Sequence, residues 1–361
     1  MKLLPQAVLH ILYKLRFAGL TVLLAASTAC SFDYAKHAKA QRCSSLFSYE
    51  RQLKPDPEIE KEFYKVNKRF GGPGIYFVDY FKDMGKKHCG RPAIDYMLFL
   101  KGYLRGKPKT DFGSMVDSVG TAIHETAHHY SSLAYQFDQS IDKRRTRYHL
   151  GRTSYYTKEM GLRHLFHTRT FPGKEIAKVI KDKNVFKNSR YAAYIGKASK
   201  YHVTQQFGIY GLLDEFHAYY YSLISKNNIL KQLDNKQRRI YLKDNTFTEL
   251  GNNDIDLSFL EFKLFILSYF RVAEEYYPDI YKQLMNYPDL LDVTLIIHDK
   301  FEQQYMESQR IYKKDKLHDS FTKERKTLTT ELALPEYGQM LNKLRKTRIK
   351  LSHKLKTPMP G

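Results

Sequence analysis

The run from Thr121 to Tyr130 constrains this chain of 361 residues most strongly, because it sets His124, Glu125 and His128 inside an apolar, helix-compatible segment. In a helix the two histidines project from one face, one turn apart. Two imidazoles at that separation can hold one Zn²⁺, and a glutamate offset by one residue can reach a water at the open metal position. The run therefore predicts a buried helix with one face committed to chemistry.

Two stripes at helical spacing support this interpretation. The apolar stripe is Met115, Val119, Ile123, Ala127 and Tyr130. The small and polar stripe is Gly120, His124, His128 and Ser131. The alternative is a surface helix whose histidines only meet solvent.

A stable zinc site needs a third protein ligand. One class of site extends the motif as His-Glu-x-x-His-x-x-Gly-x-x-His. Residues 129–134 read His-Tyr-Ser-Ser-Leu-Ala, which excludes that class. The remaining common solution is a carboxylate on a second helix.

The best candidate for that helix is the segment 208–222, which has no internal proline and a strong helical period. Glu215 is the carboxylate within a stripe of small residues: Gly208, Gly211, Ala218 and Ser222. Such a stripe lets another backbone come close, so Glu215 is expected beside the two imidazoles. Asp214 is a competing ligand, and an ordinary exposed helical glutamate is the other alternative.

The two segments, 124–128 and 214–218, resemble the zincin metallopeptidases of the glutamate-ligand type, the thermolysin-like group often called gluzincins. The resemblance implies a zincin-like core that binds one zinc ion. It implies His124, His128 and Glu215 as metal ligands and Glu125 as general base.

The chain departs from that group one turn after Glu215. There the thermolysin-like enzymes carry an aspartate that orients the first histidine, whereas this chain has Tyr219. A reaction at the zinc would also need a donor for the developing oxyanion. Candidates near the second helix are Tyr201, His202, Tyr210 and His217.

The predicted fold class is α+β and predominantly helical, with a small sheet, the two ligand helices and a C-terminal helical subdomain. Residues 75–78 are predicted as a short strand and 255–276 as a buried helix. The basic segment 142–190 is either a substrate-facing insertion or a solvated face. The expected divisions are 1–29 signal peptide, 30–57 tether, 58–228 catalytic domain, 229–335 helical subdomain and 336–361 basic tail.

The N-terminus predicts export, because basic residues precede the apolar run 17–29, which is short for a membrane span. Its end resembles a bacterial lipoprotein processing site, which would place a lipid anchor on Cys30. Ordinary cleavage after Ala29 and an uncleaved anchor are the alternatives. The expected location is the cell envelope, as a lipoprotein or periplasmic protein, or the medium after secretion.

Lipidation of Cys30 would leave an even pair in an exported chain, where disulfides persist. A bridge between Cys43 and Cys89 is therefore expected, and two unpaired buried thiols are the alternative.

The formal net charge of +22 favours anionic partners, such as envelope polymers, lipid headgroups or acidic substrates. No recognisable module predicts specific nucleic-acid binding. The terminal run 343–356 is a basic helix or a frayed tail, and its charge either attaches the chain to an anionic surface or only keeps it soluble.

These observations predict a zinc-dependent metallopeptidase of the cell envelope that acts on a peptide or protein substrate. The alternative is a non-catalytic, zincin-like envelope lipoprotein that binds an anionic surface or polymer through its basic face. An exported nucleic-acid-binding protein is a third possibility, favoured only by charge.

Overall fold

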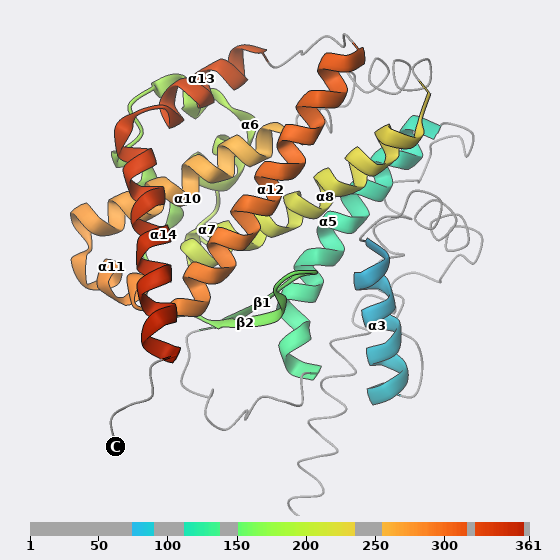
Figure 1. Ribbon diagram of the computed structural model, residues 1–361, viewed down its shortest axis with the longest axis horizontal. Coiled ribbons are helices and arrows are strands. Elements are labelled where there is room, and N and C mark those ends of the chain that lie inside the picture. Colours follow the sequence, from blue (N-terminus) through green and yellow to red (C-terminus); the bar gives the residue numbers. More distant parts are fainter. Residues whose placement is uncertain (1–73, 90–111, 138–150, 235–254, 316–321, 357–361) are drawn as a thin grey trace, which may run out of the picture.

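The computed structural model describes residues 74–89, 112–137, 151–234, 255–315 and 322–356 (Figure 1). The described chain is predominantly helical and contains one two-stranded sheet, which confirms the α+β prediction at that level. The expected signal peptide and tether lie outside these residues.

The elements follow one another along the chain in a fixed order. The α-helices are α3 (Gly74–Cys89), α5 (Phe112–Phe137), α6 (Ser189–Tyr191), α7 (Val203–Gln206), α8 (Ile209–Gln232), α10 (Leu257–Tyr276), α11 (Pro278–Met285), α12 (Pro288–Asp315), α13 (Thr322–Leu332) and α14 (Pro335–Lys356). The strands are β1 (Arg152–Thr157) and β2 (Gly161–Phe166). Two short 3₁₀ helices, η1 (Gly173–Lys178) and η2 (Lys183–Lys187), and one π-helical turn, η3 (Ala192–Gly196), complete the described elements.

Helix α8 lies at the centre of the described structure. It packs against α5 on one side and against α10 and α12 on the other, as the ribbon shows (Figure 1). Most of its side chains are buried, aromatic and polar ones included. A helix buried nearly all round is a core helix, so α8 fixes where its neighbours sit.

Helix α3 packs against α5 through aromatic rings. Tyr76, Phe77 and Tyr80 surround the Tyr130 ring, with centroid distances of 5.9, 4.9 and 4.7 Å. The strand predicted for residues 75–78 is therefore wrong, because this segment belongs to α3. Its β-branched and aromatic residues favour a strand by composition, but packing on α5 decides the conformation.

The sheet is an antiparallel hairpin whose register runs from Arg152 opposite Phe166 to Thr157 opposite Gly161. Gly161 has a φ of 68°, which favours glycine at the start of β2. Strand β1 is largely buried and is held to α8, because the Tyr221 hydroxyl donates to the Tyr156 carbonyl at 2.7 Å. Within the segment 142–190, residues 152–166 therefore form a partly buried hairpin. The sequence had suggested only a substrate-facing insertion or a solvated face for this segment.

Helix α10 confirms the buried helix predicted for residues 255–276. It carries Glu261, which accepts from the Arg190 guanidinium at 2.7 Å. Both side chains are almost fully buried. This ion pair joins α10 to the α6 segment in the interior.

The basic C-terminal segment is helical between Pro335 and Lys356 and packs on α12 and α10. Several of its cations are paired with acids of those helices: Lys343 with Glu274, Arg345 with Asp299 and Arg348 with Asp292. Of the two predicted forms, the structure shows the helix.

The expected boundary between residues 228 and 229 falls inside α8, which contacts both the metal-motif helix α5 and the C-terminal helices. Cys89, at the end of α3, is disulfide-bonded, and both other cysteines, Cys30 and Cys43, lie outside the described residues. Among the described helices, none is long and apolar enough to cross a membrane.

Replacing Glu261 by alanine is predicted to destabilise the fold by roughly 3–5 kcal/mol, because the buried Arg190 guanidinium would lose its carboxylate partner. The matched control is Glu159→Ala, which removes an exposed partner of Lys300 and should change stability by less than about 1 kcal/mol. Urea unfolding followed by circular dichroism measures both. Equal losses for the two variants would contradict the role assigned to the buried pair.

Candidate metal site

Antiparallel packing of α5 on α8 creates the candidate site. The Ser222 hydroxyl of α8 donates to the Gly120 carbonyl of α5 at 3.2 Å, so the two backbones approach closely there. From that contact, α5 runs toward His128 while α8 runs back toward Glu215. The small residues at Gly120 and Ser222 therefore let the histidine face of one helix meet the carboxylate of the other.

The structure brings His124, His128 and Glu215 together. The two Nε2 atoms are 3.1 Å apart, and Glu215 Oε2 lies 3.6 Å from His124 Nε2 and 3.4 Å from His128 Nε2. Zinc bound tetrahedrally at about 2.0–2.2 Å would separate its ligand atoms by roughly 3.3–3.6 Å. Two of the three separations fall within this range and the third is slightly shorter, so the three donor atoms could share one ion. A tetrahedral ion held by three side chains would keep a fourth position for a small ligand.

The buried Glu215 carboxylate has an oxygen without a hydrogen bond. Glu215 Oε2 accepts no hydrogen bond from any described residue, although burial makes an unsatisfied polar atom costly. Burial acts to raise the pKa of Glu215, but His128 and His124 outweigh it and lower that pKa below its usual range. A metal ion bound by all three side chains would satisfy the oxygen.

Asp214 holds His128 from the opposite side of the ring. Its Oδ2 lies 2.8 Å from His128 Nδ1, and its Oδ1 accepts from the Ser131 hydroxyl. Burial acts to lower the pKa of His128, yet the charges of Asp214 and Glu215 raise it well above the usual range. Asp214 therefore orients the imidazole and leaves Nε2 to face the cluster, so it is not placed as the competing ligand.

Tyr219, one turn after Glu215, contacts His124 through its ring. The ring packs edge-on against His124 with centroids 4.4 Å apart. Its hydroxyl is 2.9 Å from the hydroxyl of Tyr194, and the Arg190 guanidinium lies 4.7 Å from its ring centroid. Tyr219 and Tyr194 thus form an aromatic wall beside His124, backed by the buried Arg190.

The four expected oxyanion donors lie in different places. Tyr201 is 70% exposed, and His202 caps α7 through Thr204. Tyr210 uses its hydroxyl on Thr168, and His217 Nε2 lies 2.9 Å from the Tyr156 carbonyl oxygen. Sequence reasoning missed Tyr194, since nothing in the sequence distinguishes it among 29 tyrosines.

Glu125 follows His124 on α5 and is partly exposed. No hydrogen bond or ion pair joins its carboxylate to another described residue. The side chain is therefore free to meet a water or substrate at the mouth of the cluster.

A second group among the described residues, His298, Asp299 and Glu302, also has donor atoms close together. Its carboxylates already have cations, because Asp299 pairs with Arg345 at 2.7 Å and Glu302 with Lys263 at 3.0 Å. This group needs no metal to balance its charge.

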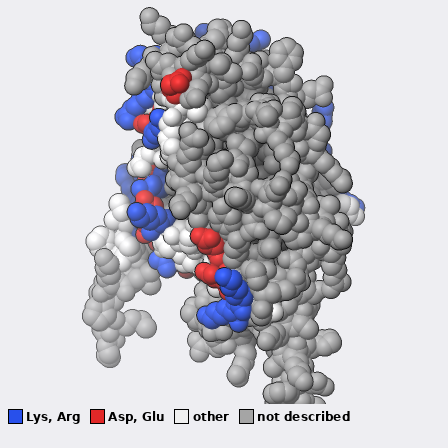
Figure 2. Space-filling model, turned by 90° about the vertical axis from the view of Figure 1, so that its right-hand side faces the viewer, with Lys and Arg blue, Asp and Glu red and all other residues white. Residues whose placement is uncertain are grey.

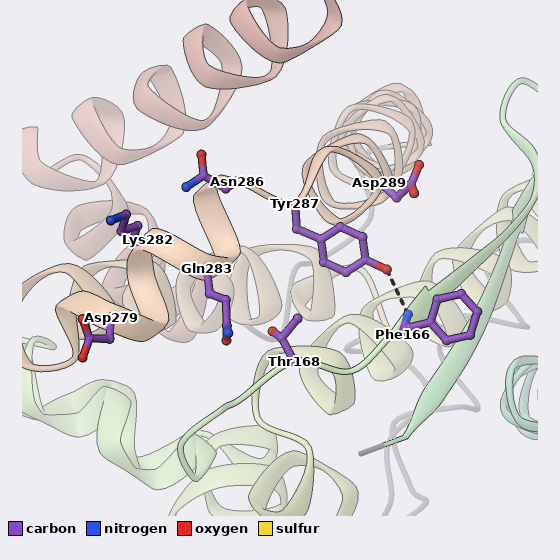
Figure 3. Close-up of a pocket in the computed structure, with 8 residues that line it drawn as sticks. All are labelled: Phe166, Thr168, Asp279, Lys282, Gln283, Asn286, Tyr287 and Asp289. Carbon is purple, nitrogen blue, oxygen red and sulfur yellow. Dashed lines mark hydrogen bonds between the residues drawn. The ribbon is translucent and has the colours of Figure 1, made fainter. Parts of the chain in front are cut away.

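The larger of two hollows near the strands is remote from this chemistry. It has a volume of about 660 Å³ and lies between the end of β2 and the helices α11 and α12 (Figure 3). Its acids, Asp279 and Asp289, lie in the first turns of these two helices, where negative charge is favourable. The helix dipoles therefore account for these acids without a ligand.

Compared with known proteins, the chain matches no protein-family model, no curated protein and no solved structure. Its function therefore has to be inferred from the geometry of its own residues.

Asp214→Asn is predicted to weaken zinc binding about 10- to 100-fold while the fold survives, because the amide cannot replace the carboxylate on His128. Competition with a chromophoric chelator measures the affinity, and circular dichroism checks the helices. The matched control is Asp279→Asn, an exposed aspartate of α11, which should leave the affinity unchanged. An unchanged affinity for Asp214→Asn would remove its orienting role.

Proposed function

We propose that the chain is a zinc-dependent metallopeptidase in which His124, His128 and Glu215 hold one zinc ion. The observation that carries this proposal is the triangle of donor atoms, with sides of 3.1, 3.4 and 3.6 Å, in a buried interface. Two imidazoles and one carboxylate are a typical ligand set of catalytic zinc sites, which keep one coordination position open for water or substrate. The α5 and α8 helices would form the centre of a zincin-like core.

Bound zinc would lower the pKa of a coordinated water and polarise a substrate carbonyl. Glu125, next to His124 on α5, is the proposed general base. Its carboxylate takes the proton from the attacking water and returns it to the leaving nitrogen. Asp214 keeps the His128 ring oriented at 2.8 Å throughout, so the ligand geometry does not have to be rebuilt during turnover.

Export to the cell envelope forms part of the same proposal. It is supported by the N-terminal basic and apolar pattern, with its lipoprotein-like end at Cys30. The disulfide at Cys89 also fits an oxidising compartment, because disulfides are rare where thiols are kept reduced.

The basic-surface alternative receives less support from the described residues. The cations of α14 that are paired with acids of α10 and α12 are partly neutralised. On the face shown in Figure 2, the described lysines and arginines lie beside aspartates and glutamates. Mixed charge of this kind does not make a uniform anion-binding field.

Glu125→Gln is predicted to abolish hydrolysis of fluorescein-labelled casein, with a fall of about 10²- to 10⁴-fold, while zinc affinity stays within about threefold. Glu215→Ala should lose both zinc and activity, because two imidazoles alone do not hold the ion. Glu159→Gln, on the exposed turn between the strands, is the matched control and should behave as wild type.

The two readouts separate the alternatives. Zinc binding without any hydrolysis by the wild type would favour the non-catalytic protein. Full retention of zinc by Glu215→Ala would move the third ligand elsewhere.

A further inference from the structure

A semi-enclosed cavity of about 390 Å³ lies behind His128, one of the two metal-site histidines. Its wall includes the second half of α5, the ends of both strands and the start of α8. Asp214 belongs to this wall, and the same carboxylate holds His128. The cavity therefore lies one imidazole ring away from the candidate metal position, on the opposite side of His128. Its volume is within the range of small-molecule sites.

Aromatic rings form part of the wall of this cavity. Phe166, Phe207 and Tyr210 line it, and Tyr210 stacks on His167 with centroids 4.2 Å apart. Rigid rings of this kind provide apolar area at low entropic cost. They favour a ligand with an aromatic or branched apolar body.

Arg152 is the charged side chain of this wall that has no oppositely charged partner among the described residues. Its guanidinium lies 4.1 Å from the Tyr135 ring centroid. Asp214 is already engaged on both oxygens, by His128 and by Ser131. An arginine held on a ring and free of acids matches a carboxylate well.

His167 adds a buried polar atom to the same wall. Its Nε2 lies 2.7 Å from the Thr153 hydroxyl, while its Nδ1 is buried without a hydrogen-bond partner among the described residues. The side chain is 5% exposed. Burial lowers the pKa of His167 to about 4, against the attraction of Asp214, so the ring is neutral near pH 7. A neutral imidazole can hydrogen-bond a polar ligand group without a competing charge.

We propose that this cavity binds a small organic carboxylate with an aromatic or branched apolar body, its carboxylate facing Arg152. The binding is coupled to the metal centre through Asp214 and His128, and this coupling alone rests on the zinc site of the proposed function. Zinc would place positive charge one imidazole ring away, so it should strengthen the binding of an anion. By thermodynamic linkage the anion must strengthen zinc binding by the same factor.

Isothermal titration calorimetry of the full chain tests the site with three probes. They are N-acetylphenylalanine, its uncharged amide, and N-acetylglycine, which lacks the ring. We expect N-acetylphenylalanine to bind about five- to tenfold more tightly than either of the others, because each lacks one of the two features that the cavity matches. Equal binding of all three probes, or none, overturns the site.

Substitutions locate the binding. Arg152→Gln should remove the preference of the acid over the amide, whereas Arg163→Gln, an exposed arginine of the same hairpin outside the cavity, should keep it. Because the chain has no tryptophan, Phe207→Trp places a single fluorescent reporter in the wall. Loss of the preference in both arginine variants, or an unchanged tryptophan signal when calorimetry shows binding, overturns this location.

The coupling is measured by repeating the titrations with zinc-loaded and chelator-treated protein. Zinc should tighten N-acetylphenylalanine binding about two- to tenfold, and the acid should tighten zinc binding by the same factor. Binding with no change between the two states overturns the coupling. None of these readouts depends on hydrolysis, so a chain without peptidase activity would not by itself change them.

Discussion

The close antiparallel contact between α5 and α8 is the interaction on which the candidate site depends. Neither helix carries a complete ligand set, and the contact at Gly120 and Ser222 fixes how far the helices can slide past each other. A shift of one residue would rotate Glu215 by about 100° away from the imidazoles. Helix α8 is in turn held by α10, α12 and β1, so much of the described core serves to keep this register.

The same contact buries a set of ionisable groups. Two imidazoles and two carboxylates lie between the helices, and Glu215 Oε2 has no hydrogen-bond partner among the described residues. Charged groups removed from water usually weaken a fold unless they are paired or bind metal. In contrast, Glu261 and Arg190 form a buried pair at 2.7 Å whose charges balance. The group between α5 and α8, whose Glu215 oxygen has no hydrogen bond from the described residues, is therefore the one that indicates a function.

Local pattern predicted the parts of this arrangement that depend on one helix at a time. The spacing of His124 and His128, the buried character of α10 and the selection of Glu215 over Asp214 all follow from helical period. The stripe of small residues on α8 was predicted to face α5, but Gly211 lies against α7 instead. A Cβ at Gly211 would overlap the Val203 carbonyl of that helix. Long-range packing could not be predicted. It turned residues 75–78 into helix and placed Tyr194 next to Tyr219, and neither outcome has a signal in the neighbouring sequence.

X-ray absorption spectroscopy of the zinc-loaded full chain tests the central claim most directly, because it reports the atoms around the metal without needing a substrate. The arrangement of His124, His128 and Glu215 predicts one zinc per chain, with nitrogen and oxygen neighbours at about 2.0–2.1 Å and outer-shell scattering from two imidazoles. A sulfur neighbour at about 2.3 Å, or scattering from fewer or more than two imidazoles, would contradict it.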